Sequence, residues 1–348
     1  MKIRTGWWQG VVAAVALLGL AAAPAAQAQK PYDVAARWKV GGVGWWDYMS
    51  IDPVSHDLYI TRGNHVMVLN STTGHMIADI AGLKGTHGVV FAKDGVTGFI
   101  SDGGADDVAY FNRKTNEIKG TVPAGKDPDG ITYDPYTNSV WAFNGRSDTA
   151  TVIDARTKKV LATVALPGKP EFPVSDGKGN IYDNIESKSE IVRINAKSHR
   201  ITAVWPLAPC EHPSGLAMDA GHMRLFSVCH NGMMAVVNAE NGKVVATPAI
   251  GMGPDAARFD VKGQYALSTN GGTGTLTVIH EDSPDHYSEI ETAKTQKGAR
   301  TMAMMPGGSR LYTVTVKFGQ RPKPTAAHPH PYPTAAPNSF VVIELVKP

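Results

Sequence analysis

The sequence predicts an all-β fold, a seven-bladed β-propeller with four-stranded antiparallel blades. Residues 127–169 contain four short apolar runs, ITY, VWAF, ATVID and VLATV, and the turn residues between them predict four consecutive strands. A repeat of about 40 to 45 residues with four strands per unit is typical of propellers. Here an Asn or Asp followed by polar residues and a new apolar run recurs at intervals of 42, 42, 41 and 43 residues, at Asn70, Asn112, Asp154, Asn195 and Asn238.

A second motif supports the same repeat, because it precedes the first strand of several units as Thr86-His-Gly, Pro128-Asp-Gly, Pro213-Ser-Gly and Pro254-Asp-Ala. An α-solenoid has a similar period, but no unit shows sustained apolar positions at helical spacing. Seven units fit the chain, at 44–84, 85–126, 127–169, 170–211, 212–253, 254–298 and 299–348.

The two ends of the chain are expected to complete one blade together. The last unit ends at Phe340-VVIELV with only its third strand in place, and one strand centred on Ala36 to Val40 precedes the first unit. We expect this N-terminal strand to supply the fourth strand of the last blade. Closing the ring in this way removes the exposed sheet edges of an open structure.

The second-strand sequences Leu58-Tyr-Ile-Thr, Leu267-Ser-Thr-Asn-Gly and Leu311-Tyr-Thr-Val-Thr, with the Asn/Asp turns, resemble the YVTN or YncE-like family of bacterial seven-bladed propellers. The resemblance covers residues 44–348 and implies a WD40-like repeat architecture. Unit four and unit six, with its longer HEDSPDHYS insert, depart from the pattern. Members of this family mostly lack an assigned catalytic activity, so the resemblance implies a binding role. Propellers host many unrelated functions, and the fold alone does not select one.

The first 28 residues are predicted to be a Sec-type signal peptide. Lys2 and Arg4 precede the apolar stretch VVAAVALLGLAAA, and Ala26-Gln-Ala provides a small-residue cleavage site after Ala28. The apolar stretch is short for a spanning helix, and no Cys follows it for lipidation, so we expect no stable membrane anchor. The mature protein is then a single propeller domain, residues 29–348, in the periplasm or secreted.

The charge balance disfavours nucleic acid as a partner. Without Lys2 and Arg4, 32 of the 34 basic residues remain against 31 acidic residues, and no basic cluster stands out. Some YncE-like proteins are linked to DNA binding, but this balance does not support that role here. We expect a monomer that binds a small molecule or a protein at the channel face.

One position in each unit points to that face. In a propeller blade, the loops that enter each unit and the loops that join strands two and three converge at one end of the channel. Aligning the entry turns places Asp47, His87, Asp129, Glu171, Ser214, Asp255 and Arg300 at equivalent positions, and Arg62 and His230 lie in loops between second and third strands. Blade stability alone does not require charge here. Polar residues that merely line a wet channel are the alternative.

We therefore predict that the protein binds a ligand or partner on the face formed by its blade-entry loops. The alternative is a cation-dependent hydrolase of the lactonase type, in which channel carboxylates hold a divalent cation and activate water. The candidate metal ligands are Asp129, Glu171 and His87. No Walker loop, haem motif or Gly-x-Ser-x-Gly elbow is present. The sequence leaves open whether the protein is an enzyme, and it assigns no catalytic residue.

Two further features belong to the same face. The loop 319–338 in the last blade contains six prolines, which predicts an extended segment that could act as a lid, with His328 and His330 as possible transition-metal ligands. A plain surface loop is the alternative. Trp45 and Trp46, at the entry of the first unit, could stack a ligand ring or pack between blades.

Cys210 and Cys229 are the only cysteines, and both are expected at the channel face of the fifth blade. An exported chain with two cysteines favours a disulfide. The competing interpretation is a soft-metal site that includes His212 and His230.

Overall fold

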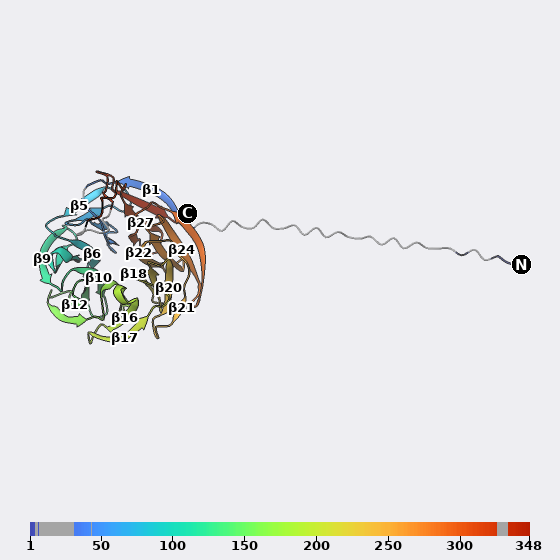
Figure 1. The fold of residues 1–348 in the computed structure, drawn as a ribbon, viewed down its shortest axis with the longest axis horizontal. Helices are drawn as coiled ribbons and strands as arrows, with labels where there is room; N and C mark the ends of the chain where they lie inside the picture. The colour runs from blue at the N-terminus through green and yellow to red at the C-terminus, as the bar shows by residue number, and fades with distance from the viewer. Residues whose placement is uncertain (4–5, 7–30, 43, 326–332) are drawn as a thin grey trace.

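Seven four-stranded antiparallel sheets surround a central axis in the computed structural model (Figure 1). The structure describes residues 1–3, 6, 31–42, 44–325 and 333–348. The predicted signal peptide and the central part of the loop 319–338, including His328 and His330, therefore fall largely outside the described residues. In the described ranges, no helix has the length and apolar character needed to cross a membrane.

In blades 1 to 4 the chain runs from the innermost strand to the outermost (Figure 1). Blade 1 contains β2 (Met49–Ile51), β3 (Leu58–Thr61), β4 (Val66–Leu69) and β5 (Met76–Ile80). Blade 2 contains β6 (Thr86–Phe91), β7 (Thr97–Asp102), β8 (Asp107–Asn112) and β9 (Glu117–Pro123), with the 3-10 helix η1 (Gly103–Ala105). Blade 3 contains β10 (Pro128–Asp134), β11 (Ser139–Asn144), β12 (Thr149–Asp154) and β13 (Val160–Ala165). Blade 4 contains β14 (Pro170–Ser175), β15 (Asn180–Ile185), β16 (Glu190–Asn195) and β17 (Arg200–Pro206), with η2 (Glu186–Lys188).

Blades 5 and 6 repeat this order, whereas blade 7 takes its outermost strand from the N-terminus. Blade 5 contains β18 (Pro213–Asp219), β19 (Arg224–Cys229), β20 (Met233–Asn238) and β21 (Val244–Ala246). Blade 6 contains β22 (Pro254–Asp260), β23 (Tyr265–Asn270), β24 (Thr275–Ser283) and β25 (His286–Lys294). Blade 7 contains β26 (Met302–Met304), β27 (Arg310–Thr315), β28 (Val341–Val346) and β1 (Asp33–Lys39).

The predicted closure of the ring is confirmed. Strand β1 pairs antiparallel with β28, and the register places Arg37 opposite Ile343. Tyr32, just before β1, is fully buried, and its hydroxyl donates a hydrogen bond of 2.8 Å to the Gly308 carbonyl. The N-terminal segment is therefore part of the core of blade 7 and protects the edge that β28 would otherwise expose.

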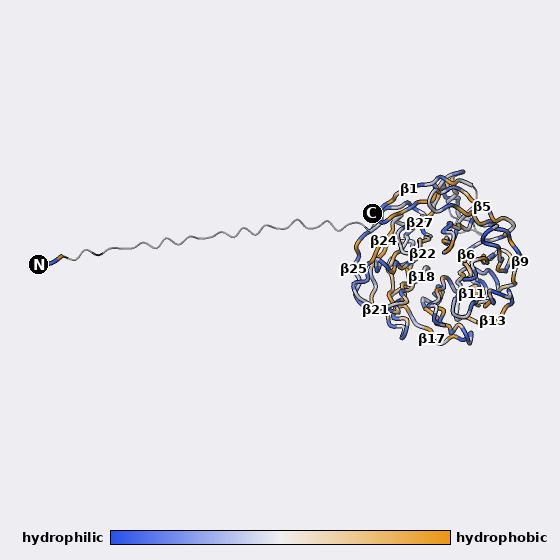
Figure 2. The backbone as a smooth tube through the Cα atoms, turned by 180° about the vertical axis from the view of Figure 1, so that it is seen from behind, coloured by the Kyte–Doolittle hydropathy of each residue, from blue (hydrophilic) through white to orange (hydrophobic). Residues whose placement is uncertain are grey.

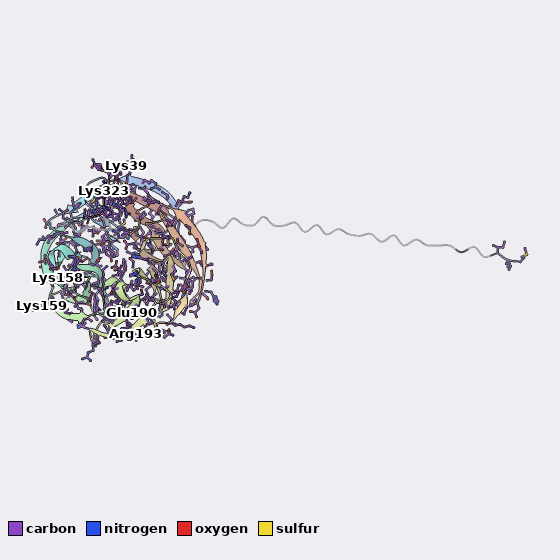
Figure 3. The ribbon with its side chains drawn as sticks, in the orientation of Figure 1. Lys39, Lys158, Lys159, Glu190, Arg193 and Lys323 are labelled. Carbon is purple, nitrogen blue, oxygen red and sulfur yellow. A yellow bond between two sulfur atoms is a disulfide. The ribbon has the colours of Figure 1, made fainter. Side chains whose placement is uncertain are left out.

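Apolar side chains pack between neighbouring blades. Tyr59 of blade 1 and Phe111 of blade 2 share one buried cluster, and Leu58 of blade 1 and Tyr312 of blade 7 share another across the closure. Polar and apolar residues alternate along the chain all around the ring (Figure 2). Charged side chains such as Lys39 and Arg193 project from the outer rim (Figure 3). This pattern is expected of sheets that bury both faces and expose only their outer edge.

Five of the innermost strands begin with the same irregularity, and it positions the site. Their pairing with the second strand shifts register within the first few residues, as between Thr86 and Val89 in β6. Such bulges change the direction of a side chain without ending the strand. The second residue of each of these strands lies within the shift, and these residues are His87, Asp129, Glu171, Ser214 and Asp255.

Candidate functional site

The aligned entry positions form a nearly continuous polar chain around one end of the channel, which we call the polar ring. It consists of the seven aligned residues, from Asp47 to Arg300. Direct contacts link six of them across blades: His87 contacts Asp47 and Asp129, Arg300 contacts Asp47 and Asp255, and Asp255 accepts a hydrogen bond from Ser214. Arg300 thus forms ion pairs with the carboxylates of both neighbouring positions in the ring, Asp255 and Asp47.

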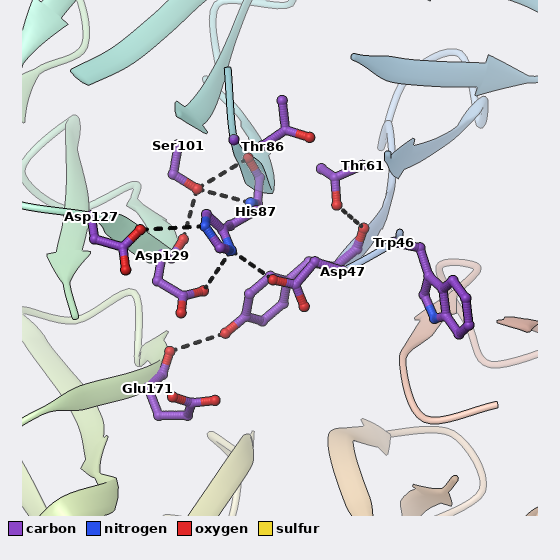
Figure 4. Close-up of polar contacts among 12 residues, drawn as sticks. Trp46, Asp47, Thr61, Thr86, His87, Ser101, Asp127, Asp129 and Glu171 are labelled. Atoms are coloured by element: carbon purple, nitrogen blue, oxygen red, sulfur yellow. Dashed lines mark hydrogen bonds and ion pairs between the residues drawn. The ribbon is translucent and has the colours of Figure 1, made fainter. Parts of the chain in front are cut away.

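His87 lies at the centre of the most acidic part of the ring (Figure 4). Its Nδ1 is 2.7 Å from Asp47 Oδ2 and 3.4 Å from Asp129 Oδ1, and its Nε2 is 3.7 Å from Asp127 Oδ1. Burial alone would lower the pKa of His87, but these carboxylates outweigh burial and raise the pKa to about 11. The imidazole is therefore held as a cation that balances part of the acidic charge.

Asp129 is the least compensated member of this group. Its Oδ1 is buried and makes no hydrogen bond among the described residues, since His87 is at ion-pair rather than hydrogen-bond distance. Burial raises the pKa of Asp129 to about 7, and the charge of Asp47 adds to burial while His87 opposes it. A buried carboxyl that titrates near neutral pH is a feature of functional sites more often than of stabilising ones.

Glu171 belongs to a neighbouring acidic group on the blade 4 side. Lys169 Nζ lies 3.0 Å from Glu171 Oε2 and 2.5 Å from Glu186 Oε2. The Tyr48 hydroxyl donates a hydrogen bond of 3.1 Å to the Glu171 carbonyl and so links blade 1 to blade 4. Burial, with added repulsion from Asp129, raises the pKa of Glu171 well above its ordinary value.

Asp183 lies behind this group and is fully buried. Neither of its carboxylate oxygens has a hydrogen-bond partner in the part of the chain that the structure describes. Burial raises the pKa of Asp183 well above its ordinary value, and the charges of Glu171 and Asp129 act in the same direction. The group of carboxyls thus extends beneath the ring as well as around it.

A cavity of about 490 Å³ opens beside the ring at the junction of blades 6, 7 and 1, and we call it the aromatic pocket. Its walls are Trp45, Trp46 and Phe318, and Arg300 belongs to both the pocket and the ring. Trp45 keeps 46% of its surface exposed, whereas Trp46 is buried. The remaining walls are backbone only, formed by Gly253, Gly271, Gly272 and Gly298.

These glycines are required by close approach. A Cβ on Gly271 would lie 2.8 Å from the Cβ of Arg300, and a Cβ on Gly298 would lie 2.4 Å from the Phe318 ring. Gly298 also has a φ of +83°, which residues other than glycine rarely adopt. The glycines therefore let Arg300 and Phe318 reach the pocket and leave flat backbone surfaces there.

The loop 319–338 starts at the pocket. Phe318 forms a β-bridge with Ala335, and the Gly319 N–H donates a hydrogen bond of 2.7 Å to the Thr334 carbonyl. The two ends of the loop are thus joined beside Trp46, whose ring centre lies 6.4 Å from that of Phe318. This places the base of the predicted lid against the aromatic wall.

Two residues predicted for the site are not part of the ring. Arg62 is buried, with 1% of its surface exposed, and its guanidinium lies 3.6 Å from the centre of the Phe340 ring. It donates hydrogen bonds to the Gly41 and Gly44 carbonyls, so it holds the segment before blade 1 rather than facing the channel. His230 is exposed at the entry face, with its ring centre 6.2 Å from that of His212.

The predicted metal ligands are only partly brought together. Donor atoms of Asp47, His87 and Asp129 all lie within 4.8 Å of one another, whereas Glu171 is not in this set. Such N and O donors suit a divalent cation. In the ring, the charged side chains of His87 and Arg300 already balance carboxylates. A metal cation bound at His87 would therefore have to displace the imidazole proton.

The cysteines form the expected disulfide. Cys210 and Cys229 are bonded, with their Cα atoms 5.6 Å apart and both side chains buried. The bond joins the loop before β18 to the end of β19. It therefore fixes the segment that carries His212 and His230 at the entry face.

Several contributors to the site were not predicted. Asp127 and Lys169 stand two residues before Asp129 and Glu171, a spacing that places side chains on the same side of an extended segment, so this signal was present in the sequence. Tyr48, Asp183 and the glycine walls have no comparable signal. Their role follows from how neighbouring blades approach each other.

No protein-family model matches the chain, and no curated protein matches it. Among solved structures, a chain of the Kuenenia stuttgartiensis hydrazine synthase superposes with a TM-score of 0.69 at 13% identity, covering 79% of this chain and 95% of that chain. A chain of the mitotic checkpoint complex superposes with a TM-score of 0.71 at 13% identity, covering 88% and 95%. Streptogramin B lyase gives a TM-score of 0.66 at 14% identity, covering 86% and 92%. At these identities the similarity shows the propeller fold alone.

Proposed function

We propose that this protein binds a small molecule at its entry face, with the polar ring and the aromatic pocket as the two halves of one site. The observation that carries the proposal is the pocket itself, a cavity of about 490 Å³ with aromatic walls that shares Arg300 with the ring. Small-molecule sites are typically cavities of about 300–1,000 Å³, largely apolar, with a few convergent polar groups. The cost in stability of the buried ring carboxylates supports a role other than packing.

The charges around the ring favour a ligand with a cationic group. Carboxylates outnumber cations, and Arg300 is already paired with Asp255. Trp45 and glycine backbone line the same pocket, and they favour a planar ring, since aromatic side chains stack on planar groups and attract cations to their faces. We therefore propose a planar aromatic or similarly flat amine. The carboxylates are Asp47, Asp127, Asp129, Glu171, Glu186 and Asp255, and the cations are His87, Arg146, Lys169 and Arg300.

We also propose that the protein is exported, either to the periplasm or out of the cell. The N-terminal sequence supports export, and a buried disulfide is consistent with an oxidising compartment. The resemblance to YncE-like propellers, whose members mostly lack an assigned catalytic activity, supports a binding role. Cell fractionation with N-terminal sequencing tests it: we expect a mature chain that begins at Gln29, and a cytoplasmic chain that retains Met1 would contradict it.

Tryptamine is a suitable probe, because it combines a planar indole with an ammonium group, and indole-3-acetate is its counterpart of opposite charge. By isothermal titration calorimetry we expect tryptamine to bind and indole-3-acetate to bind at least about tenfold more weakly. Trp45→Ala should weaken tryptamine binding by about fivefold or more, as stacking on an aromatic residue contributes on the order of 1 kcal/mol or more.

Tyr136→Ala is the matched control, since Tyr136 is an exposed aromatic residue in the β10–β11 turn at the opposite face. It should leave tryptamine binding unchanged. Equal binding of tryptamine to the Trp45→Ala variant and the wild type would refute the pocket, and a preference for indole-3-acetate would refute the proposed ligand charge.

A second candidate is cation-dependent hydrolysis at the same ring. It is favoured by the cluster of Asp47, His87 and Asp129 donor atoms within 4.8 Å. Metal analysis of protein purified without a His tag tests it. A stoichiometric cation that is lost in Asp129→Asn would support hydrolysis. A metal-free protein that still binds tryptamine would support the binding role and not hydrolysis.

A further inference from the structure

One position at the face opposite the ring is structurally equivalent in six blades. In each case a residue near the end of the third strand donates its backbone N–H to the residue before the second strand, with distances of 2.8 to 3.1 Å. In blade 2 this residue is Arg113, which forms a buried ion pair with Asp52 of blade 1, with an Nε to Oδ2 distance of 2.7 Å. The residues at this position are Arg113, Ala155, Ala196, Ala239, Glu281 and Lys347.

Blade 6 places an acid where blade 2 has its arginine. Asp219 is the last residue of the innermost strand of blade 5, Asp52 directly follows the innermost strand of blade 1, and Glu281 takes the position of Arg113. His222 lies between the two acids, with its Nδ1 2.8 Å from Asp219 Oδ2 and 3.5 Å from Glu281 Oε1. Donor atoms of all three residues lie within 4.8 Å of one another. The ion pair of blades 1 and 2 is thus replaced by two carboxylates and an imidazole.

Burial makes this replacement costly unless something compensates it. Asp219 and Glu281 each expose only 3% of their surface. Asp219 accepts backbone N–H groups from Gly221 and His222, but Glu281 Oε2 has no hydrogen-bond partner among the described residues. Two buried carboxylates repel each other, and an unsatisfied charged oxygen costs several times a typical hydrogen bond. A cation is the group that this geometry lacks.

Arg224, the register partner of Asp219 on the neighbouring strand, serves another contact. Arg224 donates its Nε to the Pro284 carbonyl at 2.7 Å, and its Nη2 lies 2.7 Å from Asp285 Oδ1. These partners belong to the hairpin between β24 and β25, which are nine residues each and longer than the strands of the sister blades. The tip of the longer hairpin therefore folds back toward blade 5.

The same hairpin also covers the acid pair. The Tyr287 hydroxyl lies 3.2 Å from Glu281 Oε1 and donates to the Pro284 carbonyl at 2.7 Å. His222 remains half exposed, so the group is accessible from solvent on one side. The insertion in unit six thus provides a cover for a small polar site and leaves it one opening.

We propose that Asp219, His222 and Glu281 bind a divalent transition-metal cation that bridges blades 5 and 6. Two carboxylates and an imidazole are ligands that suit Mn²⁺ or Zn²⁺, and water molecules on the open side would complete the coordination. The cation would take the place that the Arg113 guanidinium has between blades 1 and 2. Its role is structural, and it is independent of ligand binding at the entry face.

Mn²⁺ is the test probe, because free and bound Mn²⁺ are distinguished by electron paramagnetic resonance. Full-length mature protein, made without a His tag and treated with chelator, should bind one equivalent of Mn²⁺, which Zn²⁺ displaces. Glu281→Gln and Asp219→Asn should each weaken this site at least about tenfold. His87→Gln is the matched control, since it removes the imidazole of the ring cluster and should leave this equivalent unchanged.

Thermal unfolding gives a second readout that does not depend on the affinity. Mn²⁺ should raise the melting temperature of the wild type but not that of Glu281→Gln, since a ligand stabilises only the state that binds it. Glu281→Arg should restore the Arg–Asp pair of blades 1 and 2 and melt at or above the metal-free wild type. The proposal is overturned if the wild type binds neither Mn²⁺ nor Zn²⁺, since Asp219 and Glu281 would then share a proton instead. It is also overturned if Glu281→Gln binds Mn²⁺ as tightly as the wild type.

Discussion

At the scale of single residues, Asp129 shows a conflict between function and stability. It is partly buried in the ring, it faces Asp47 and Asp127 as well as His87, and burial raises its pKa to about 7. Above that pH the folded protein must hold a carboxylate that the unfolded chain would leave in water. A residue that lowers stability in this way is expected at a site where ligand binding offsets the loss.

Asp129→Asn should therefore stabilise the protein, and the gain should depend on pH. The folded pKa of about 7 lies above the ordinary value of 3.8, so the contribution of Asp129 to the free energy of unfolding falls as pH rises from about 4 through 7. The variant should melt several degrees above the wild type at pH 8 and close to it at pH 4. One pKa unit corresponds to about 1.4 kcal/mol, and partial exposure and His87 reduce the full effect.

The control is Asp33→Asn, which removes an exposed carboxylate on β1. Its melting temperature should differ between pH 4 and pH 8 by the same amount as that of the wild type. An Asp129→Asn variant that loses stability at pH 8 would show that Asp129 acts mainly as a stabilising partner of His87. The same variant should bind tryptamine more weakly.

His87 gives a pH dependence in a separate window. Its pKa is raised to about 11 by the surrounding carboxylates, so its stabilising charge is fully present below pH 6.5 and is lost as pH rises through 11. His87→Gln should thus destabilise the protein most below pH 6.5 and progressively less toward pH 11. Chemical denaturation at pH 6, 8 and 10 measures this trend, and a constant difference across the three would contradict the assignment of a charged imidazole.

At the scale of elements, the disulfide ties an entry loop to the strand that follows it. The two cysteines are 19 residues apart in sequence. A loop of about this size contributes on the order of 3 kcal/mol in the chain-entropy model. Replacing both cysteines by Ala should lower the melting temperature by roughly 5–10 °C. Thiol titration of the denatured wild type should find no free thiol, and two free thiols would revive the metal-binding interpretation of these cysteines.

Strand β1 is the element on which closure of the ring depends. Deleting residues 30–42 removes the partner of β28 and the buried Tyr32, so we expect loss of cooperative unfolding or a loss of more than about 5 kcal/mol. Tyr32→Phe is a milder change that removes only the hydrogen bond to Gly308 and should cost about 1 kcal/mol. A deletion variant that melts like the intact protein would contradict the closure.

Elements were more predictable from sequence than sites. The spacing of Asn70, Asn112 and Asp154 determines the repeat, because each lies where the third strand ends and the turn to the fourth strand begins, and the apolar runs between the turns then place the strands. The same alignment brought the ring residues together, since equivalent bulges carry them. It misplaced Arg62, because one residue in a loop can turn into the core and sequence spacing does not reveal that turn. The aromatic pocket depends on glycines whose only signal is the absence of a side chain.

At the scale of the whole molecule, the ring of blades separates two faces with different chemistry. The entry face holds the polar ring, the aromatic pocket and the base of the loop 319–338. The opposite face holds the turns between first and second strands, each stabilised by local contacts, and the acid pair of blades 5 and 6. The two sites lie on opposite faces of one closed ring, so a substitution at one site can be made while the fold that holds the other site stays intact.

The central claim is that the ring and the aromatic pocket act as one ligand site, and a crystal structure of the protein soaked in tryptamine tests it most directly. We predict the indole between Trp45 and the backbone of Gly271 and Gly272, with the ammonium within about 3 Å of a ring carboxylate. Tryptamine bound elsewhere on the propeller, or a pocket that stays free of it at concentrations that saturate binding in solution, would contradict the claim.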